Sequence, residues 1–411
     1  MSPKVTSFPR EKINILLLEN ISHTAVEFMN QKGYANIIQV AGALPEAELI
    51  KALKNVHLVG LRSKTTITPK VLESSPKLQA IGAFCIGTNQ IDLEVANRKG
   101  VAVFNAPYSN TRSVAELVIG TSIMLIRRIP EKDNAAHEGI WLKDATGSRE
   151  IRGKVLGIIG YGNIGSQVSI LAEAMGMKVV YFDILTKLPL GNAVRCKTLK
   201  ELLQQSDIVS LHVPDTPQTR NMIDDDMLKL FKKGSLLINY ARGEVMDLNA
   251  VARSLEAGRL GGVAVDVYPE EPEKNGQQFF SPLQGKGNVI LTPHIGGSTV
   301  EAQENIGLDV STKLLSFLET GNTYGSLSVP PINLPVQDGT HRILHIHENV
   351  PGVLSEINTA LGNAGINISG QYLATNNEVG YVVLDVDNQL SNKAMHLLKD
   401  VKNTIRTRVL F

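Results

Sequence analysis

The sequence contains few of the residues that define several large protein classes. Its 411 residues include only 2 cysteines and 1 tryptophan. Cys85 and Cys196 lie in unrelated segments, which excludes a disulfide framework or a multi-cysteine zinc site. No run of about 18 uncharged apolar residues is present, and the first twelve residues lack the apolar core of a signal peptide. The reducing cytoplasm is therefore the expected location.

The chain also lacks an excess of charge of either sign. The chain has 41 Lys and Arg against 40 Asp and Glu, so it has no basic excess. Neither nucleic acid nor a membrane is expected as a partner. The length exceeds what one compact core accommodates and predicts two or three domains.

The first hundred residues alternate apolar stretches with amphipathic ones. Strand candidates lie at 13–19, 56–63, 78–84 and 101–105, with helix-like segments between them. Near-continuous apolar strands separated by helices indicate a parallel sheet covered on both faces.

The alternation resumes after a long helix candidate at 111–129. Six strand candidates follow, at 154–160, 178–183, 207–213, 235–240, 261–267 and 288–292. Six such strands with helical segments between them predict a doubly wound dinucleotide fold.

The last part of the chain changes its pattern. A second long helix candidate, 299–321, precedes a proline-rich stretch at 328–339 that predicts a linker. The remaining seventy residues follow the order β-α-β-β-α-β, which predicts a ferredoxin-like module.

A glycine motif opens the second alternating region. Gly160, Gly162 and Gly165 form GxGxxG directly after an apolar strand, and Asp183 ends the next strand, eighteen residues beyond Gly165. The three glycines permit a tight turn, close approach of a pyrophosphate and close helix packing. Asp183 would accept hydrogen bonds from ribose hydroxyls and repel a 2′-phosphate. The motif therefore predicts NAD as cofactor.

Three types of polar residue follow the later strands of this region. Arg242, Asp266 with the acids Glu270 and Glu271, and His294 each come after a strand candidate. Each type alone is more often a surface charge or a structural histidine. Because the carboxyl ends of parallel strands meet at one edge, together they predict a site where histidine moves a proton and arginine binds a carboxylate.

At these segments the chain resembles NAD-dependent D-2-hydroxyacid dehydrogenases. The resemblance rests on "GIIGYGNIG", "LINYARGEVMD", "GVAVDVYPEEP" and "LTPHIGGST", in this order. It implies an α/β fold in which a Rossmann-like NAD-binding domain (109–295) is inserted into a flavodoxin-like substrate-binding domain (1–108 and 296–330). The tail, 339–411, resembles an ACT regulatory domain.

The resemblance assigns roles to single residues. Arg242 would bind the substrate carboxylate and carbonyl, His294 would be the acid/base, and Glu271 would pair with His294. Tyr240 departs from the small residue usual at its position and could stack on or narrow the cofactor site. The expected cofactor-binding residues are Gly160, Gly162, Asn163, Ile164, Gly165, Asp183, Tyr240, Ala241, Asp266, Gly296 and Gly297.

The resemblance also implies the small molecules that bind. It points to the branch of the family that acts on 3-phosphoglycerate, which Arg62, Ser63 and Asn110 would bind. His347, Asn349 and Asn367 of the tail would bind L-serine as an effector at a subunit interface, in a homotetramer. A metal site on the histidines of 341–347 is disfavoured because no acid or cysteine completes it, so no metal is expected.

Three alternatives stay open. Another D-2-hydroxyacid dehydrogenase would act on glyoxylate, hydroxypyruvate or 2-oxoglutarate. A non-catalytic NAD-sensing regulator could use the same fold, although the presence of Arg242, Glu271 and His294 counts against it. The tail could be a dimerisation module that binds no ligand.

Overall fold

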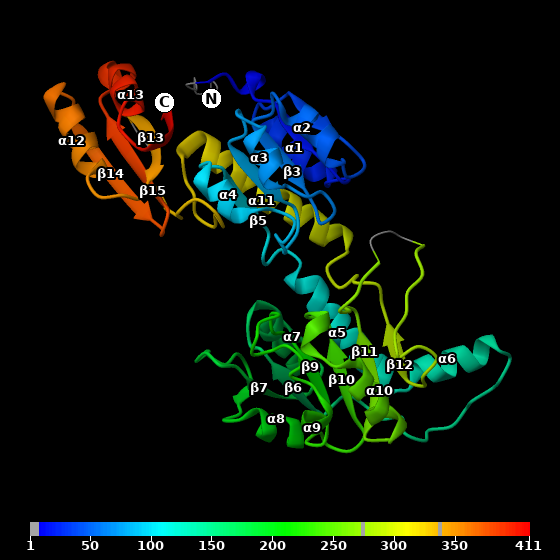
Figure 1. Cartoon of the computed structure of the whole chain (residues 1–411). Helices are drawn as coiled ribbons and strands as arrows, with labels where there is room; N and C mark the ends of the chain where they lie inside the picture. The colour runs from blue at the N-terminus through cyan, green and yellow to red at the C-terminus, as the bar shows by residue number, and fades with distance from the viewer. Residues whose placement is uncertain (1–7, 273–275, 336–338) are drawn as a thin grey trace. The chain divides into compact units, whose positions relative to one another are not determined.

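The computed structural model describes residues 8–272, 276–335 and 339–411. The chain divides into two compact units (Figure 1). The larger unit combines Met1–Ser109 with Gln303–Phe411, and the smaller unit is Asn110–Ala302.

The first sheet of the larger unit is parallel, with strand order β2-β1-β3-β4-β5. This is the order of flavodoxin-like folds. Its strands are β1 (Ile15–Leu17), β2 (Ile37–Gln39), β3 (Leu58–Leu61), β4 (Ala80–Ala83) and β5 (Ala102–Asn105). The helices of this part are η1 (Arg10–Lys12), α1 (His23–Gln31), α2 (Glu46–Leu53), α3 (Pro69–Glu73), α4 (Leu93–Arg98) and the long α11 (Val300–Thr320).

The two faces of this sheet form separate cores. Side chains alternate along a strand, so Ile15 and Leu17 of β1 pack with α1 and α11, whereas Leu16 packs with α2, α3 and α4. Buried residues on both faces explain why these strands are apolar throughout.

The sheet of the smaller unit is parallel and has seven strands, in the order β12-β11-β10-β9-β6-β7-β8. Its strands are β6 (Val155–Ile159), β7 (Lys178–Phe182), β8 (Val194–Arg195), β9 (Ile208–Leu211), β10 (Ser235–Asn239), β11 (Leu260–Val265) and β12 (Val289–Leu291). The helices are α5 (Thr111–Ile126), α6 (Ile129–His137), α7 (Asn163–Ala174), α8 (Leu199–Gln205), α9 (Asp225–Leu228), η2 (Gly243–Val245) and α10 (Leu248–Glu256). Helices α5 and α7 cover one face, and α8, α9 and α10 cover the other. The strand order reverses between β6 and β9, which is where doubly wound folds bind ligands.

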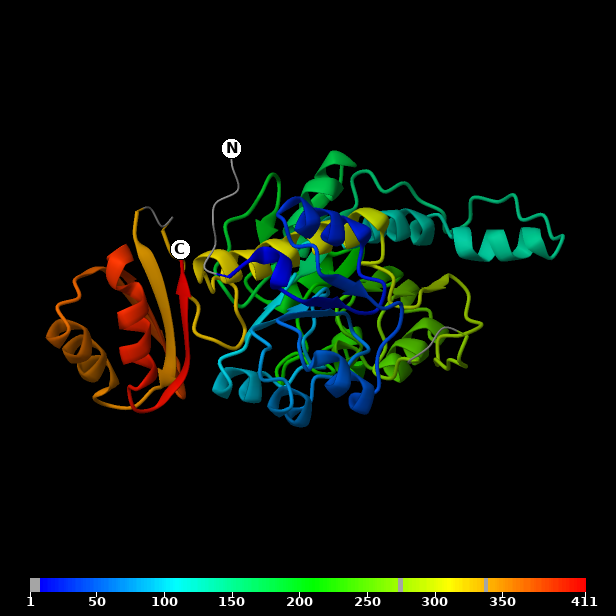
Figure 2. The same ribbon diagram turned by 90° about the horizontal axis from the view of Figure 1, so that it is seen from above.

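The tail module forms a four-stranded antiparallel sheet of order β14-β15-β13-β16. Its elements are β13 (His341–Glu348), α12 (Val353–Asn363), β14 (Ile368–Thr375), β15 (Val379–Val386), η3 (Asn388–Leu390), α13 (Ser391–Lys399) and β16 (Thr404–Leu410). Both α12 and α13 cover one face of the sheet, and the other face packs against the rest of the larger unit (Figure 2). The predicted fold class, two α/β parts and a ferredoxin-like tail, is confirmed.

The tail sheet provides hydrogen-bond donors to the end of α11, where backbone carbonyls lack intrahelical partners. Arg342 and Arg408 donate to two carbonyls of its last turn at 3.1 and 2.9 Å, and the Tyr381 hydroxyl donates to the residue after it at 2.6 Å. The acceptors are the carbonyls of Thr320, Leu318 and Gly321. The end of the helix is therefore capped by a separate module of the chain.

Some elements differ from the sequence-based expectation. The helix predicted at 111–129 breaks at Arg128, which has a left-handed φ of 55° and separates α5 from α6. The short strands β2 and β8 were missed. The predicted linker is wrong for its first part, because Val329 and Ile332 are buried in the core and the Ser328 hydroxyl donates to Val101 O at 2.7 Å. Residues 336–338 of that stretch lie outside the described residues.

In the part of the chain that the structure describes, no helix combines the length and the apolar character needed to cross a membrane.

Candidate active site

The glycine motif lies at the turn from β6 into α7. Gly160 has φ +91°, and a Cβ there would collide with the carbonyl oxygen of His212; a Cβ at Gly165 would collide with Gly160 O. A Cβ at Gly162 would meet nothing within 4 Å, so the space in front of this residue is open. Helix α7 begins at Asn163, and Ile164 follows in its first turn, where N–H groups lack intrahelical partners. This geometry suits a pyrophosphate.

Asp183 lies just beyond β7, close to this turn. One of its carboxylate oxygens accepts from Tyr161 N and the other from Leu185 N, both at 2.8 Å. Each oxygen keeps a further lone pair for a ribose hydroxyl. The carboxylate therefore also holds the glycine turn, a task that the sequence did not reveal.

His294 and Glu271 form a direct pair. His294 Nδ1 lies 2.8 Å from Glu271 Oε2, and Glu271 Oε1 accepts from Tyr268 N at 3.0 Å. The hydrogen bond that His294 donates to Glu271 raises the pKa of His294 above its ordinary value, although burial acts the other way. Burial alone would raise the pKa of Glu271, but the hydrogen bonds from His294 and Tyr268 outweigh it and lower that pKa. The ionised carboxylate directs the Nδ1 proton toward itself and leaves Nε2 of a neutral ring free to accept a proton.

The loop that carries His294 is held by a buried carboxylate. His294 has a left-handed φ of 54°, which is costly for a residue with a side chain. Asp266, 1% exposed, accepts from Thr292 Oγ1 at 2.6 Å, Ile295 N at 2.8 Å and Gly296 N at 2.7 Å. Asp266 thus anchors both sides of His294.

Arg242 follows β10 at the same edge of the sheet. Its Nη1 donates to Ala241 O at 2.7 Å, and its charge acts on the pKa values of both His294 and Glu271. Buried Asn239 closes the turn, because it donates to Arg242 O at 2.9 Å and accepts from Ala241 N at 3.1 Å. The structure therefore brings the three predicted catalytic residues together.

Two positioning residues were missed by the sequence reading. One is Asn239. The other is Tyr268, whose hydroxyl lies 3.1 Å from Val265 O and 3.0 Å from Thr292 O and shares its one proton between them, so that it links the ends of β11 and β12. In the sequence, both appear only as a polar side chain within an apolar segment. That pattern does not show which groups the side chain bonds to.

Tyr240 contributes its ring to the core of the smaller unit. Its ring is 5% exposed and belongs to the apolar core between the sheet and α5, with Val118 and Ile238. Burial raises the pKa of its hydroxyl. The ring is therefore part of the core, and a role for Tyr240 in cofactor binding stays a prediction.

Gly296 and Gly297 were expected among the cofactor-binding residues. In the structure a Cβ at Gly296 would lie 3.0 Å from Asp266 Oδ2, and a Cβ at Gly297 would collide with Asn110 Nδ2. The two glycines therefore make room for these side chains. Asn110 precedes α5, is 8% exposed, and its Oδ1 is buried with no partner among the described residues.

The other predicted substrate residues belong to the larger unit. Arg62 and Ser63 follow β3, and Gln90 donates to Arg62 O at 2.5 Å. The next two residues are fixed by Glu19, which is 7% exposed and accepts from Lys64 N at 3.0 Å and Thr65 N at 2.8 Å. The loop is therefore held by side chains from two other segments.

The predicted effector residues lie at both ends of the first helix of the tail. Asn349 and Asn367 are exposed, and Asn349 donates to Asn376 O at 2.7 Å. His347 is only 3% exposed and packs closely against Gly380.

Comparison with known families agrees with this geometry. Residues 119–296 match the NAD binding domain of D-isomer specific 2-hydroxyacid dehydrogenases, and residues 343–406 match the AHAS small subunit-like ACT domain. The chain belongs to the family of D-isomer specific 2-hydroxyacid dehydrogenases.

Particular relatives are more specific than the family. The chain is 49% identical to a D-3-phosphoglycerate dehydrogenase of Haemophilus influenzae, over 100% of both chains, and 49% identical to one of Escherichia coli, over 98% of this chain and 99% of the relative. A solved D-lactate dehydrogenase from Aquifex aeolicus, complexed with NAD and lactic acid, is 29% identical with a TM-score of 0.63, over 74% of this chain and 95% of that one.

These comparisons confirm the enzyme class, the NAD cofactor and the ACT-like tail. They count against the non-catalytic regulator, since the most similar relatives carry the names of dehydrogenases. The roles of individual residues stay predictions.

Proposed function

We propose that the chain oxidises 3-phospho-D-glycerate to 3-phosphohydroxypyruvate with NAD, and that L-serine inhibits it. The carrying observation is the His294–Glu271 pair beside Arg242, in a chain that is similar over its whole length to D-3-phosphoglycerate dehydrogenases. In this proposal 1–108 and 296–330 bind substrate, 109–295 bind NAD, and 339–411 bind the effector.

The catalytic step follows from the site geometry. NAD would be held by the turn of Gly160, Gly162 and Gly165 with Asp183, and it would supply the hydride acceptor for the carbon that carries the substrate hydroxyl. His294 Nε2 accepts the hydroxyl proton, while Glu271 keeps the ring oriented and stabilises its charged form. Arg242 binds the substrate carboxylate and polarises the C–O bond that changes order. In reduction the protonated His294 returns the proton.

Substrate choice rests on Arg62, Ser63 and Asn110. Arg62 supplies a cation for the phosphate, and the buried Oδ1 of Asn110 is an acceptor for a substrate hydroxyl. Oxidation of NADH with 3-phosphohydroxypyruvate, glyoxylate, hydroxypyruvate and 2-oxoglutarate tests this choice. We expect the highest kcat/KM with the phosphorylated acid. Arg62→Gln should lower it about 100-fold for that substrate and much less for glyoxylate, whereas the exposed Arg98→Gln should change neither. A preference of the unaltered enzyme for glyoxylate would favour the alternative dehydrogenase.

L-serine would bind the tail through His347, Asn349 and Asn367. The exposed amides of the two asparagines can bind an amino acid's ammonium and carboxylate groups. Asn349→Ala should raise the serine concentration for half-inhibition at least tenfold with an unchanged uninhibited rate; Asn363→Ala, on the exposed side of α12, serves as the control. If Asn349→Ala and Asn363→Ala are inhibited by serine to the same extent, the proposed effector site in the tail is wrong.

A homotetramer in the cytoplasm completes the proposal. An arm after α6 exposes Ile140, Trp141 and Leu142 at 50%, 84% and 47%, a cluster typical of a surface covered by another chain. The two free cysteines agree with a reducing compartment. Light scattering after size exclusion should give a tetramer mass for the unaltered enzyme and a smaller mass for Trp141→Ser.

A further inference from the structure

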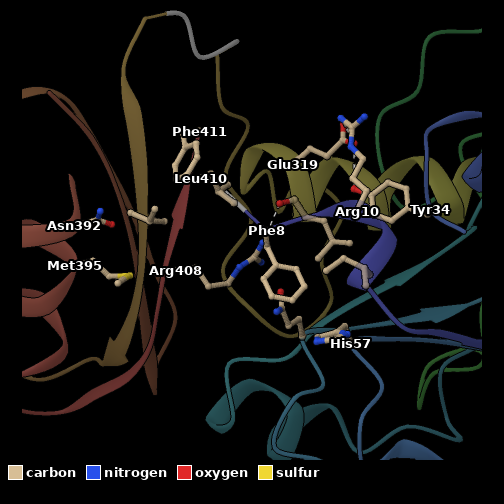
Figure 3. A pocket seen from close by; sticks show the side chains of 14 residues that line it. Phe8, Arg10, Tyr34, His57, Glu319, Asn392, Met395, Arg408, Leu410 and Phe411 are labelled. Carbon is tan, nitrogen blue, oxygen red and sulfur yellow. Dashed lines mark hydrogen bonds and ion pairs between the residues drawn. The ribbon is translucent and has the colours of Figure 1, made fainter. Parts of the chain in front are cut away.

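The larger unit contains a cavity of about 370 Å³ where β16, the end of α11 and the first residues of the described chain meet (Figure 3). This volume lies in the range of small-molecule sites. Neither the substrate residues Arg62 and Ser63 nor the predicted effector residues line it. The cavity is therefore separate from both sites discussed above.

One wall of the cavity contains an uncompensated positive charge. Arg408 extends from β16 toward Phe8 (Figure 3), donates from Nη2 to Leu318 O at 2.9 Å and lies 5.3 Å from the ring centroid of Phe317. Its Nη1 is buried and has no partner among the described residues. Burial lowers the pKa of Arg408 to about 10, which reflects the free energy of keeping this charge away from water. A buried guanidinium of this kind favours an anion as neighbour.

The other polar groups of the cavity are mostly donors. Arg10 is paired with Glu319 at 2.9 Å, but its Nε is buried without a partner in the described residues. His57 Nδ1 accepts from Asn14 N at 3.0 Å, so the neutral ring carries its proton on Nε2. Burial, with the charges of Lys77 and Arg408, lowers the pKa of His57 and keeps the ring neutral.

Acceptor and apolar groups complete the lining, and the one carboxylate among the described lining residues, Glu319, is engaged by Arg10 and Tyr34. Gln79 Oε1 is buried and has no partner among the described residues. Phe8, Leu318 and Leu410 supply apolar surface. A ligand that fits this set has one anionic group, a hydroxyl or amine, and a short carbon chain.

We propose that this cavity binds a small organic anion, whose carboxylate or phosphate group pairs with Arg408. Two N–H groups of the guanidinium would then have acceptors in place of one, and Arg10 Nε and His57 Nε2 would complete the anion's hydrogen bonds. Because Arg408 also caps α11, the bound ligand would stabilise the contact between the tail and that helix.

A neighbouring arginine provides a matched control. Arg406 lies on the same strand and the same face, donates to Leu78 O at 2.5 Å, and burial lowers its pKa to about 10 as well. It borders a second cavity of only about 20 Å³, which holds no more than a water molecule. Arg406→Gln therefore reproduces the loss of a buried cation without changing the larger cavity.

The test uses the full-length protein saturated with NAD, at constant ionic strength. Inorganic phosphate, 3-phosphoglycerate and L-malate are titrated by calorimetry, and the ligand-induced shift of the thermal midpoint is recorded. Binding at the predicted active site is the same in all variants, so the difference between them isolates the cavity. We expect at least one probe to bind the unaltered protein and Arg406→Gln with affinities within threefold, and Arg408→Gln at least tenfold more weakly.

The probes distinguish the source of the anion. Binding of phosphate alone identifies the phosphate group as sufficient, whereas binding of malate without phosphate identifies a carboxylate ligand. If Arg408→Gln does not fold, Arg408→Lys replaces it. This variant keeps the positive charge but loses the two parallel N–H donors of the guanidinium, so it should bind the anion about tenfold more weakly than Arg406→Lys. Identical affinities for the Arg408 variants and their controls, or no saturable binding beyond the active site, would overturn the proposal.

Discussion

His294 and His345 show how differently one side chain behaves in two parts of this chain. His294 is half exposed and has a carboxylate at 2.8 Å, and its pKa is raised. His345 is fully buried in the tail sheet, its Nε2 contacts Thr404 Oγ1 at 2.9 Å, and burial together with His347 lowers its pKa to about 4. A carboxylate partner, and not the depth of burial, makes a histidine basic enough for proton transfer.

The largest expected effect is loss of the base. His294→Asn removes the group that accepts the proton, so kcat should fall by about 10²- to 10⁴-fold. NAD binding should stay within about twofold, because the glycine turn and Asp183 lie on other strands. Turnover from NADH absorbance and affinity from NADH fluorescence check both statements. Near-normal turnover would place the base elsewhere.

Removal of the carboxylate should make His294 more like an ordinary histidine. Glu271→Gln should lower the pKa of His294, because the first cause of its rise is the hydrogen bond that His294 donates to the Glu271 carboxylate. Oxidation requires the neutral ring of His294. The acid limb of the pH–rate profile for oxidation should therefore move to lower pH, and kcat should fall about tenfold. The neighbouring exposed acid provides the control: Glu270→Gln should change neither the rate nor the pH profile. If the acid limb of the pH–rate profile does not move in Glu271→Gln, the His294–Glu271 pair does not set the pH dependence of the rate.

The pKa of His345 is shifted in the opposite direction, and its effect is measured as a change in the free energy of unfolding. The unfolded chain binds a proton near pH 6.5, whereas the folded one binds it only near pH 4, so stability should fall as the pH drops through this window. The slope is at most about 1.4 kcal/mol per pH unit. His345→Gln should flatten it, and the exposed His396→Gln should not. Urea unfolding at several pH values between 7 and 4 measures the difference, and equal slopes in the two variants would contradict it.

The smallest effect concerns the support of the His294 loop. Tyr268→Phe removes the hydroxyl that donates to the carbonyls at the ends of β11 and β12, which costs about 1 kcal/mol of stability. The kcat should fall only a few-fold, with an unchanged pH profile, since the His294–Glu271 contact persists. A shifted acid limb would show that Tyr268 acts on His294 itself.

The sequence allowed prediction where one local pattern has one structural outcome. Apolar strands followed by glycine or charged residues gave both parallel sheets, and the motif around Gly160 gave the cofactor turn. Short edge strands such as β2 and β8 bury few side chains and therefore leave little periodicity. The break at Arg128 depends on packing of the neighbouring elements, which no local pattern encodes.

The site was predictable to a similar degree. The strand ends predicted acids near His294, and the family resemblance assigned Glu271 as its partner. The tasks of Asp266, Asn239 and Tyr268 could not be derived, because a side chain's hydrogen-bond partners depend on which loops the fold brings together. For the same reason the packing of the Tyr240 ring in the core could not be derived.

The capping of α11 by the tail has a consequence for dissecting this protein. Arg342 is 0% exposed, pairs with Asp385 at 2.7 Å and donates to the carbonyl of Thr320, while Arg408 and Tyr381 donate to those of Leu318 and Gly321. A truncated chain that stops before β13 would leave those carbonyls bare and uncover Phe317 and Leu318 to solvent. Removing the tail therefore does not yield an unregulated version of the same enzyme; regulation is better studied by point substitution than by deletion.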